Sequence, residues 1–431
     1  MPGTDTHLAI EAVWRIESAR LIAGLTRIVR DVGVAEDLAQ DALVAALEQW
    51  PQAGVPDNPA AWLMGTARHR AIDMFRHHTL AQRKHEELGR ELDSGQHSAV
   101  SDLDAAIDDD VGDDLLRLIF IACHPVLSTE AQIALTLRLL GGLSTDEIAR
   151  AFLVSEPTIA QRIVRAKKTL AEARVPFEVP RGSDFTARLS SVLQVIYLVF
   201  NEGYSATSGD DWLRPELCDD ALRLGRILAE LVPKEPEVHG LVALMEIQAS
   251  RARARVGPSG EPVLLLDQDR GRWDHLLITR GFAALERAGA LGQLGPYGLQ
   301  AAIAACHARA RTAGETDWAR ISELYDELAR LTPSPVIELN RAVAVGMASG
   351  PAEGLKLVEQ LRSDPSLGAY HLLSSVRGDF LAKLHRFTEA KEEFERAASL
   401  TRNAPERNLL LARARACEAS LTEIRTRSVP R

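Results

Sequence analysis

At 431 residues the chain is too long for one helical domain, and we expect two to four domains. Hydrophobic residues make up 46% of it and aromatic residues 5%, and the alternating Val, Ile and Thr patterns of strands are scarce, so an all-α fold is predicted. The longest apolar run, near residues 192–200, is too short for a membrane span, and the N-terminus does not resemble a signal peptide. These features argue against a membrane protein and favour a cytoplasmic one.

The cysteines are widely scattered and lack the spacing of zinc ligands. We therefore expect small buried thiols in a reducing compartment, with no metal site and no cofactor. The four residues are Cys123, Cys218, Cys306 and Cys417.

The net charge of -10 is concentrated in one segment. Between Glu86 and Asp114 there are eleven acidic residues and one basic residue, Arg90, so this segment carries -10 and the remainder sums to zero. Charges are screened beyond about 10 Å at ordinary salt, so a neutral body with basic helices can still bind DNA locally. The overall acidity does not exclude a nucleic-acid partner.

Residues 7–50 contain two helical patterns whose apolar sides should pack together. The second pattern opens with Glu36 and Asp37, and it exposes Asp37, Gln40 and Asp41 opposite its apolar side. An acidic first turn is favourable beside the positive end of a helix dipole, which is enough to account for these acids. The predicted core of the pair is Ile10, Val13, Ile16, Leu21, Leu25, Ile28, Leu38, Ala42, Leu43, Ala46, Leu47 and Trp50.

A basic helix is predicted after the turn at residues 54–57. Asn58 is placed to cap it, and Pro59 occupies its first position. The candidate core residues are Trp62, Leu63, Ala67, Ile72 and Phe75. The basic surface consists of Arg68, His69, Arg70, Arg76, His77, His78, Arg83 and Lys84.

A helix-turn-helix is predicted over residues 143–171. Ser144 and Glu147 form a capping box, the chain breaks near Leu153, and Ser155 starts a second helix with Pro157 in its first turn. The second helix turns its apolar side inward and exposes groups that bond phosphates and base edges. These are Thr158, Gln161, Arg162, Arg165, Lys167 and Lys168. A solvated basic face is also common in helical proteins without DNA, so the pattern needs its context.

The context is a resemblance to bacterial sigma factors of the extracytoplasmic-function type. The run AWLMGTARHRAID is similar to their region that opens and reads the promoter -10 element, and AEDLAQDALVAALEQW resembles their helix that docks on the RNA polymerase clamp. The helix-turn-helix resembles their domain that reads the -35 element. His69 stands where the family usually has Asn, and Leu153 occupies a turn position where Gly is common.

The resemblance implies three sets of site residues. The six exposed residues of the second helix would read the -35 element, and Asp37, Gln40 and Asp41 would bind polymerase. The set that contacts and melts the -10 element would be Trp62, Arg68, His69, Arg70, Asp73 and Arg76.

The acidic segment has two interpretations, which are compatible. Its few apolar residues predict a disordered tether between two DNA-binding domains. The resemblance implies that it threads through basic channels of the polymerase, where a run such as Asp108-Asp109-Asp110 would present the charge pattern of a nucleic-acid backbone.

The sequence leaves the minimal sigma pattern at residue 185. Long helical patterns flank the loop NEGYSATSGDDWLRPEL. Asp267, Asp269 and Arg270, followed by Trp273, suggest a catalytic site, but paired acids beside an Arg more often form a surface ion-pair and capping network.

The last part of the chain repeats. Trp318, Pro351 and Phe387 head equivalent stretches at spacings of 33 (351 - 318) and 36 (387 - 351) residues, which resemble tetratricopeptide repeats. Such helix pairs stack into a curved solenoid. Sigma factors with this kind of extension form a recognisable subgroup.

We predict five segments: sigma region 2 at 1–85, an acidic linker at 86–112, sigma region 4 at 113–175, a helical extension domain at 185–290 and repeats at 291–420. The implied protein is not an enzyme. It binds core RNA polymerase and promoter DNA, and its extension is predicted to dock on its own sigma domains or to bind an unknown protein or peptide. The alternatives are a one-component repressor with a ligand-sensing C-terminal domain and a repeat scaffold whose helix-turn-helix is structural.

Overall fold

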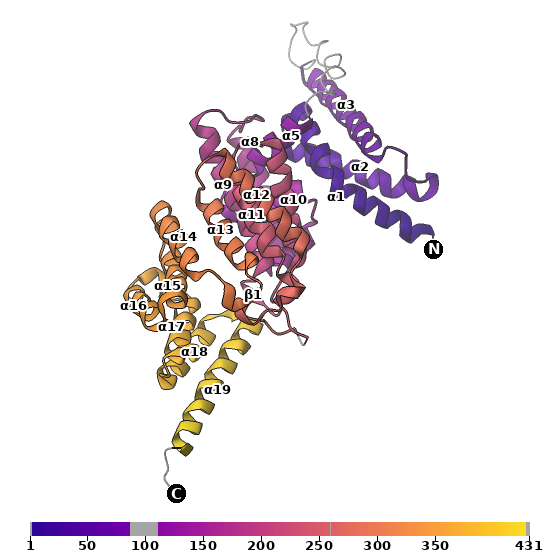
Figure 1. Ribbon diagram of the computed structural model, residues 1–431. Helices are drawn as coiled ribbons and strands as arrows, with labels where there is room; N and C mark the ends of the chain where they lie inside the picture. The colour runs from indigo at the N-terminus through magenta and orange to yellow at the C-terminus, as the bar shows by residue number, and fades with distance from the viewer. Residues whose placement is uncertain (1, 87–110, 259, 428–431) are drawn as a thin grey trace. The chain divides into compact units, whose positions relative to one another are not determined.

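The computed structural model describes residues 2–86, 111–258 and 260–427. Almost all of these residues are helical, and the strands among them are the two-residue β1 and β2 (Figure 1), which confirms the all-α prediction. None of the described helices is long and apolar enough to cross a bilayer. The acidic segment lies almost wholly outside the described residues, so both interpretations of it stay predictions. The chain divides into two compact units, residues 1–196 and 197–431.

The first unit begins with three helices, α1 (Pro2–Val29), α2 (Val32–Ala53) and α3 (Pro59–Glu86). The carboxylate of Asp31 caps α2 by accepting hydrogen bonds from the N–H groups of Gly33, at 2.7 Å, and Val34, at 3.0 Å. The predicted start at Glu36 was therefore wrong by one turn, because Gly33 made this turn look like a loop. Glu36 and Asp37 are not in the first turn, so the helix dipole does not explain them.

The predicted core of these helices is partly correct. Leu25, Ala42, Trp50 and Leu63 are buried. The prediction was wrong for three residues, because periodicity cannot tell whether a neighbour covers the end of an apolar stripe. These residues, Ile16, Leu47 and Phe75, are 64%, 39% and 42% exposed.

The remainder of the first unit packs against α1 and α2. Arg27 on α1 lies 3.2 Å from the buried carboxylate of Asp114, which also accepts a 2.7 Å hydrogen bond from Arg117. Arg27 belongs to predicted region 2 and Asp114 to predicted region 4, so the two regions pack together within the first unit. The elements are α5 (Val111–Ala122), α6 (Thr129–Thr136), the π-helical turn η1 (Leu137–Gly141), α7 (Thr145–Phe152) and α8 (Glu156–Glu172).

Helix α9 (Ser183–Tyr204) starts in the first unit and ends in the second. Its first half packs on α5: Arg188 donates a 2.8 Å hydrogen bond to the Phe120 carbonyl, and the Phe185 and Phe120 rings lie 5.5 Å apart. Ser191 donates to the carbonyl of Cys123, whose thiol has a pKa raised to about 12 by burial. All four cysteines are buried free thiols, as predicted.

The second unit begins with the end of α9 and four further helices. Helices α11 and α13 approach closely at two glycines, since a Cβ at Gly240 would lie 2.6 Å from the Gly298 nitrogen. Short 3-10 turns occupy much of the connection from α11 to α12. The helices are α10 (Pro215–Leu231), α11 (Pro236–Ala249), α12 (His275–Leu291) and α13 (Pro296–Arg309), and the turns of this connection are η2 (Ala252–Ala254), η3 (Leu265–Asp267) and η4 (Arg270–Arg272). A further turn, η5 (Ala313–Glu315), precedes α14.

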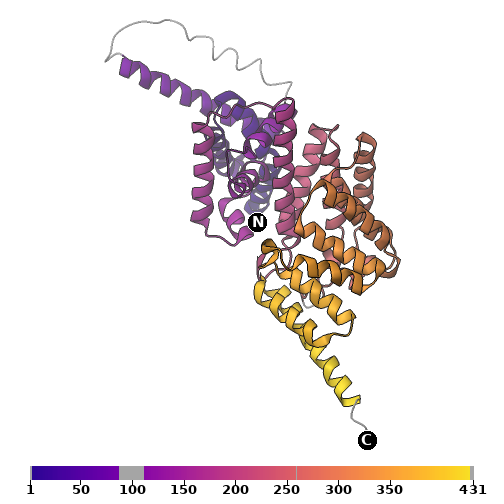
Figure 2. The same cartoon turned by 90° about the vertical axis from the view of Figure 1, so that its left-hand side faces the viewer.

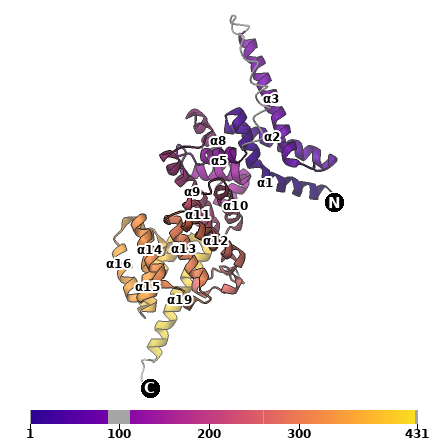
Figure 3. The ribbon, with the colours of Figure 1, turned by 45° about the horizontal axis from the view of Figure 1, so that its top comes forward.

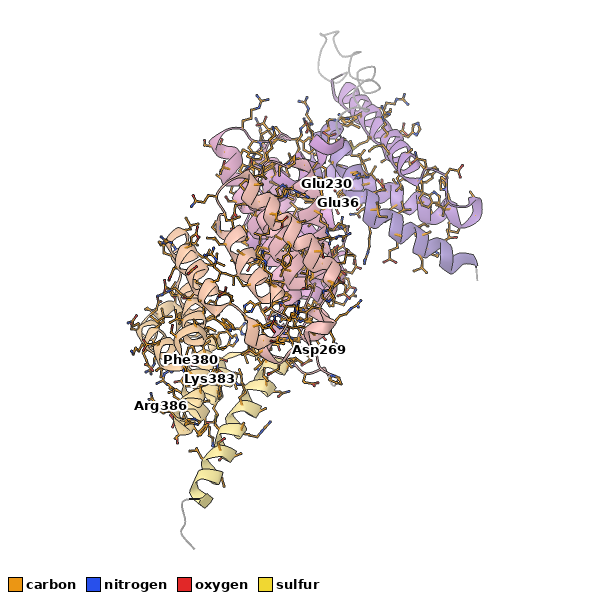
Figure 4. The ribbon with its side chains drawn as sticks, viewed as in Figure 1. Glu36, Glu230, Asp269, Phe380, Lys383 and Arg386 are labelled. Atoms are coloured by element: carbon orange, nitrogen blue, oxygen red, sulfur yellow. The ribbon has the colours of Figure 1, made fainter. Side chains whose placement is uncertain are left out.

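Three helix pairs follow. Figures 2 and 3 show this part of the chain in orange to yellow. The residues that head the predicted repeats, Trp318, Pro351 and Phe387, each begin the first helix of a pair. Phe380, labelled in Figure 4, fills the space beside Gly346 and Gly354. The spacing thus predicted the helix starts correctly, whereas the tetratricopeptide assignment stays a prediction. The pairs are α14 (Trp318–Leu331) with α15 (Pro335–Ser349), α16 (Pro351–Leu361) with α17 (His371–Lys383), joined through η6 (Pro365–Leu367), and α18 (Phe387–Leu400) with α19 (Ala404–Arg427).

A long-range pairing closes the second unit. Strand β1 (Ser208–Gly209), in the loop after α9, pairs in parallel with β2 (Arg402–Asn403), which precedes α19. The side-chain amide of Asn403 donates hydrogen bonds to the carbonyls of Ala206, at 3.1 Å, and Asp211, at 2.9 Å. The loop after α9 is therefore fixed by the last helix pair.

Candidate nucleic-acid and polymerase interface

The helix-turn-helix forms as the sequence predicted. The Ser144 hydroxyl accepts from the Glu147 N–H at 3.1 Å, and the Glu147 carboxylate accepts from the Ser144 N–H at 2.7 Å. Burial alone would raise the pKa of Glu147, but the hydrogen bonds from Ser144 and the charge of Arg15 lower it. Arg15 belongs to α1, and its guanidinium lies 3.1 Å from Glu147, so the capping box is also a contact between α1 and α7.

Leu153 makes the turn between the two helices in the left-handed conformation, with φ 51° and ψ 42°. This conformation is the one that glycine adopts most easily, and a residue with a Cβ is strained there. The departure from the family pattern at this position therefore leaves the turn geometry intact at an energetic cost.

The exposed face of α8 carries most of the predicted DNA contacts. Ile159, Ile163 and Ala166 are buried, as predicted. A cleft of about 390 Å³ lies between α8 and the start of α6, and its lining includes Thr158, Gln161, Arg162, Arg165 and Thr169. The cleft shows that these polar side chains share one accessible face.

Arg162 lies beside an acidic residue at this cleft. The pKa of Glu130 is lowered by hydrogen bonds from its own backbone and from Ser128, and further by the charge of Arg162. Arg162 is half-buried in this conformation, whereas Arg165 is exposed.

Lys167 does not point to solvent with the other predicted DNA contacts. Its ammonium lies 2.5 Å from the carboxylate of Glu36 on α2 and 3.8 Å from that of Asp37. Its outward orientation was predicted from helical spacing alone, which could not show that α2 covers this part of α8. Lys168, by contrast, is exposed and pairs loosely with Glu172 at 3.6 Å.

Glu36 is the centre of the contact between α2 and region 4 (labelled in Figure 4). Its carboxylate is only 3% exposed and accepts from Arg138 of η1 at 2.6 Å and from Gln40 at 2.5 Å, besides pairing with Lys167. We call Glu36, Gln40, Arg138 and Lys167 the Glu36 cluster. The sequence analysis did not identify Glu36 as special, and only its acidic character beside Asp37 gave a signal.

The predicted -10 and polymerase residues also meet. Arg70 of α3 lies 3.1 Å from Asp41 of α2, which joins one residue from each predicted set. Trp62 packs edge-on against Trp50 with ring centroids 5.3 Å apart, so it lies against α2.

The remaining residues of these two sets lie toward solvent to different degrees. His69 and Asp73 are exposed, and Arg76 makes a loose, exposed contact of 3.7 Å with Asp73. Asp37 is 78% exposed at its side chain, and Arg68 is half-buried.

The acidic motif in the extension does not form a catalytic pair. The Asp269 carboxylate caps η4 by accepting from the Gly271 N–H at 2.9 Å, as the capping interpretation predicted. Arg270 does not form the predicted surface ion pair. Its guanidinium instead donates to the carbonyls of His307 and Ala310 and to the Thr316 hydroxyl.

A capped helix-turn-helix packed on a basic helical domain defines a DNA-binding transcription protein. Family models match the chain at residues 16–80 (sigma-70 region 2), 117–170 (sigma-70 region 4) and 188–289 (DUF6596, a family of unknown function). An uncharacterized protein of Rhizobium meliloti (strain 1021) is 46% identical over 386 residues, which cover 89% of this chain and 90% of that protein.

A probable extracytoplasmic-function RNA polymerase sigma factor, SigI, of Mycobacterium tuberculosis (strains CDC 1551 / Oshkosh and ATCC 25618 / H37Rv) is 26% identical over 173 residues, or 40% of this chain and 58% of that protein. The chain belongs to the extracytoplasmic-function sigma factors, in a form with a C-terminal DUF6596 extension.

Proposed function

We propose that the protein binds core RNA polymerase and directs initiation at its own set of promoters, with α8 at the -35 element and α3 at the -10 element. The observation that carries this proposal is the row of Thr158, Gln161, Arg162 and Arg165 along the accessible face of a capped helix-turn-helix. Arg and Gln side chains on such a face can read base edges in the major groove. The polymerase performs the chemistry, and the protein adds recognition and strand opening, so it is not itself an enzyme.

The Glu36 cluster supports a closed resting form, because it holds region 4 against α2. The -35 and -10 elements are centred about 25 base pairs apart, or about 85 Å along B-form DNA. A compact body of 196 residues has a radius of gyration of only about 16 Å, so its two reading helices cannot reach both elements together. Binding to polymerase and promoter then requires region 4 to leave α2, which releases Lys167 and frees Asp37 for the clamp.

The extension is proposed to control this opening by docking on the sigma domains. The contacts of Arg188, Ser191 and Phe185 with α5 support this proposal, because they attach the first helix of the extension to region 4. A contact within one chain has a high effective concentration, so a weak docking surface is well occupied. The proposal gives the extension the role that a separate inhibitor protein would otherwise have.

Reconstitution with core polymerase tests the proposed function. Wild-type protein is expected to co-purify with core enzyme and to support transcription from a specific promoter. Asp41→Lys is expected to abolish assembly while changing the free energy of unfolding by no more than about 0.5 kcal/mol, because Asp41 is exposed. Unchanged co-purification of Asp41→Lys would show that α2 does not dock on polymerase, and failure of the wild-type protein to support transcription would favour a one-component regulator.

The docking proposal is tested separately with Arg188→Ala. This change removes the hydrogen bond to the Phe120 carbonyl and is expected to change transcription without changing the promoter sequence preferred. Ser190→Ala is the matched control, since Ser190 is exposed and bonds only within its own helix. If Arg188→Ala and Ser190→Ala support the same level of transcription, the contact of the extension with α5 has no regulatory role.

A further inference from the structure

Two irregular loops in the second unit bring arginines and aromatic rings together. The loop after α9 supplies Trp212, and the connection from α11 to α12 supplies Arg251, Arg255, Arg270 and Trp273. The Arg255 guanidinium lies 3.7 Å from the centroid of the Tyr204 ring and 5.3 Å from that of Trp212. Arg251 and Arg270 lie 5.8 Å and 4.9 Å from the centroid of Trp273. We call these six residues, Tyr204, Trp212, Arg251, Arg255, Arg270 and Trp273, the arginine cluster.

Backbone contacts hold the loops in place. The Ser250 carbonyl accepts from the Asp274 N–H at 2.9 Å, which closes the connection at its two ends, and the Arg255 carbonyl accepts from the Val263 N–H at 2.8 Å. Asn403 holds the other loop through the Ala206 and Asp211 carbonyls. The arrangement is therefore built by the fold rather than by flexible surface side chains.

The arginine cluster differs from other arginines of the same unit in its partners. Arg214, Arg226 and Arg377 each contact a buried glutamate, respectively Glu202, Glu246 and Glu393. Within the described part of the chain, the contacts of Arg251 and Arg255 are instead aromatic rings and the Tyr204 hydroxyl, and those of Arg270 are carbonyls and a hydroxyl. No acidic side chain among the described residues neutralises the three guanidiniums at salt-bridge distance.

Five buried N–H groups of the cluster have no hydrogen-bond partner among the residues that the structure describes. They are the Nε atoms of Arg251, Arg255 and Arg270 and the indole Nε1 atoms of Trp212 and Trp273. All five are donors only, and a buried donor without an acceptor destabilises the folded protein. The shared chemical requirement of the cluster is therefore an acceptor with several oxygens.

The local electrostatics point the same way. Burial lowers the pKa of Arg251, and the charge of Arg255 lowers it further, while Tyr204 acts in the opposite direction. The pKa of Arg270 is lowered by burial and by the charge of Arg251, which the charge of Glu315 partly opposes. The adjacent His307 has a pKa lowered to about 3 by burial and by the charges of Arg251 and Arg270, so it is neutral and adds no further positive charge. An anion would offset the repulsion among the three guanidiniums.

We propose that the arginine cluster binds the anionic group, a carboxylate or a phosphate, of a small molecule. The guanidinium fork matches both groups through paired N–H bonds, and the faces of Tyr204 and Trp212 hold Arg255 in place for them. Because Asn403 bonds the Trp212 loop to the last helix pair, the bound anion also strengthens the attachment between the loop and the repeats. This site makes the extension a sensor of a metabolite.

Thermal unfolding of the full-length protein with inorganic phosphate, citrate or chloride at matched ionic strength tests the proposal. Phosphate or citrate is expected to raise the melting temperature with a saturable dependence on concentration, since a ligand that binds only the folded state stabilises it. The phosphate and citrate arms distinguish the two anion classes. No rise above the chloride control with either anion would overturn the proposal.

Substitutions separate binding from structure. Arg251→Met and Arg255→Met are expected to weaken the apparent affinity for the effective anion by about tenfold, equivalent to ~1.4 kcal/mol, and to leave the ligand-free protein as stable as the wild type or more stable, because an uncompensated charge is removed. Arg253→Met is the matched control, because Arg253 is exposed between the two. An anion effect of the same size in all three variants would overturn the proposal. So would a loss of ligand-free stability in Arg251→Met and Arg255→Met that Arg253→Met does not show.

Discussion

The Glu36 cluster and the arginine cluster both bring charged side chains together, but only the Glu36 cluster contains a carboxylate that pairs with its cations. Around Glu36, one carboxylate pairs with an arginine and a lysine and accepts from an amide, and Asp37 lies 3.8 Å from the same lysine, so the fold supplies each cation with a carboxylate. In the arginine cluster, three guanidiniums meet with no carboxylate at salt-bridge distance among the described residues. A buried charge is tolerable when the fold supplies its partner, and a fold that omits the partner indicates that something else provides it. The first cluster holds two domains together, and the second one is suited to a ligand.

The largest expected effect on stability comes from substituting Glu36. Glu36→Gln leaves Arg138 and Lys167 without their shared counterion, and we expect a loss of about 3 kcal/mol in the free energy of unfolding, measured by urea denaturation. Glu48→Gln, an exposed change on the same helix, is the control. If Glu36→Gln were as stable as the control, the Glu36 cluster would not hold the two domains together.

The next largest effect concerns DNA binding by α8. Arg162→Ala is expected to weaken promoter binding by about 1–3 kcal/mol and to relax the preference at one base pair of the -35 element, because a base-reading arginine is lost. Binding to a panel of single-base promoter variants measures this. If Arg162→Ala binds every promoter variant of the panel as the wild type does, base reading lies on another helix.

Lys167 and Lys168 are expected to differ in their effects on stability and on DNA binding. Lys168→Ala should weaken all DNA sequences equally and lower the salt dependence of binding by about one phosphate contact, without changing stability. Lys167→Ala should instead lower the free energy of unfolding by about 1–2 kcal/mol, because it leaves part of the Glu36 charge unpaired. Equal stability of the two variants, measured in the same denaturation series, would contradict the position of Lys167 in the Glu36 cluster.

The smallest effect is a pH dependence at Glu147. Its pKa is lower in the folded protein than the ordinary value of 4.5, so its contribution to stability is present above that value and is lost as the pH falls through the folded pKa. The group is partly exposed, and the contribution is well below about 1 kcal/mol. Glu147→Gln should flatten the pH profile of stability below pH 4.5. A profile that matches wild type there would show that the capping box does not depend on the charge.

Local signals in the sequence predicted local structure well. Ser144 with Glu147, Asn58 before Pro59, and the break at Leu153 each determine the conformation of a few neighbouring residues, and the structure confirms all three. The repeat spacing also located the helix starts at Trp318, Pro351 and Phe387, since each repeat depends mainly on its neighbours.

The sequence could not predict which segments meet at a distance. Lys167 and Arg162 look alike in a helical pattern, yet α2 covers one and not the other. Arg251 and Arg255 stand in a run that reads as an ordinary basic surface, yet their guanidiniums lie against aromatic rings from distant parts of the chain. The roles proposed for the -35, -10 and polymerase residues follow from family resemblance and stay predictions.

The pairing of β1 with β2 has a consequence for synthesis of the chain. Asn403 bonds to residues 192 and 197 positions earlier, so the loop with Trp212 stays without its anchor until residue 403 has left the ribosome. Contacts between residues so far apart in sequence form late in folding. Chains that end before residue 403, through damaged messages or stalled translation, would contain complete region 2 and region 4 but no fixed loop beside the arginines. Translation through residue 403 is thus a condition for a working arginine cluster.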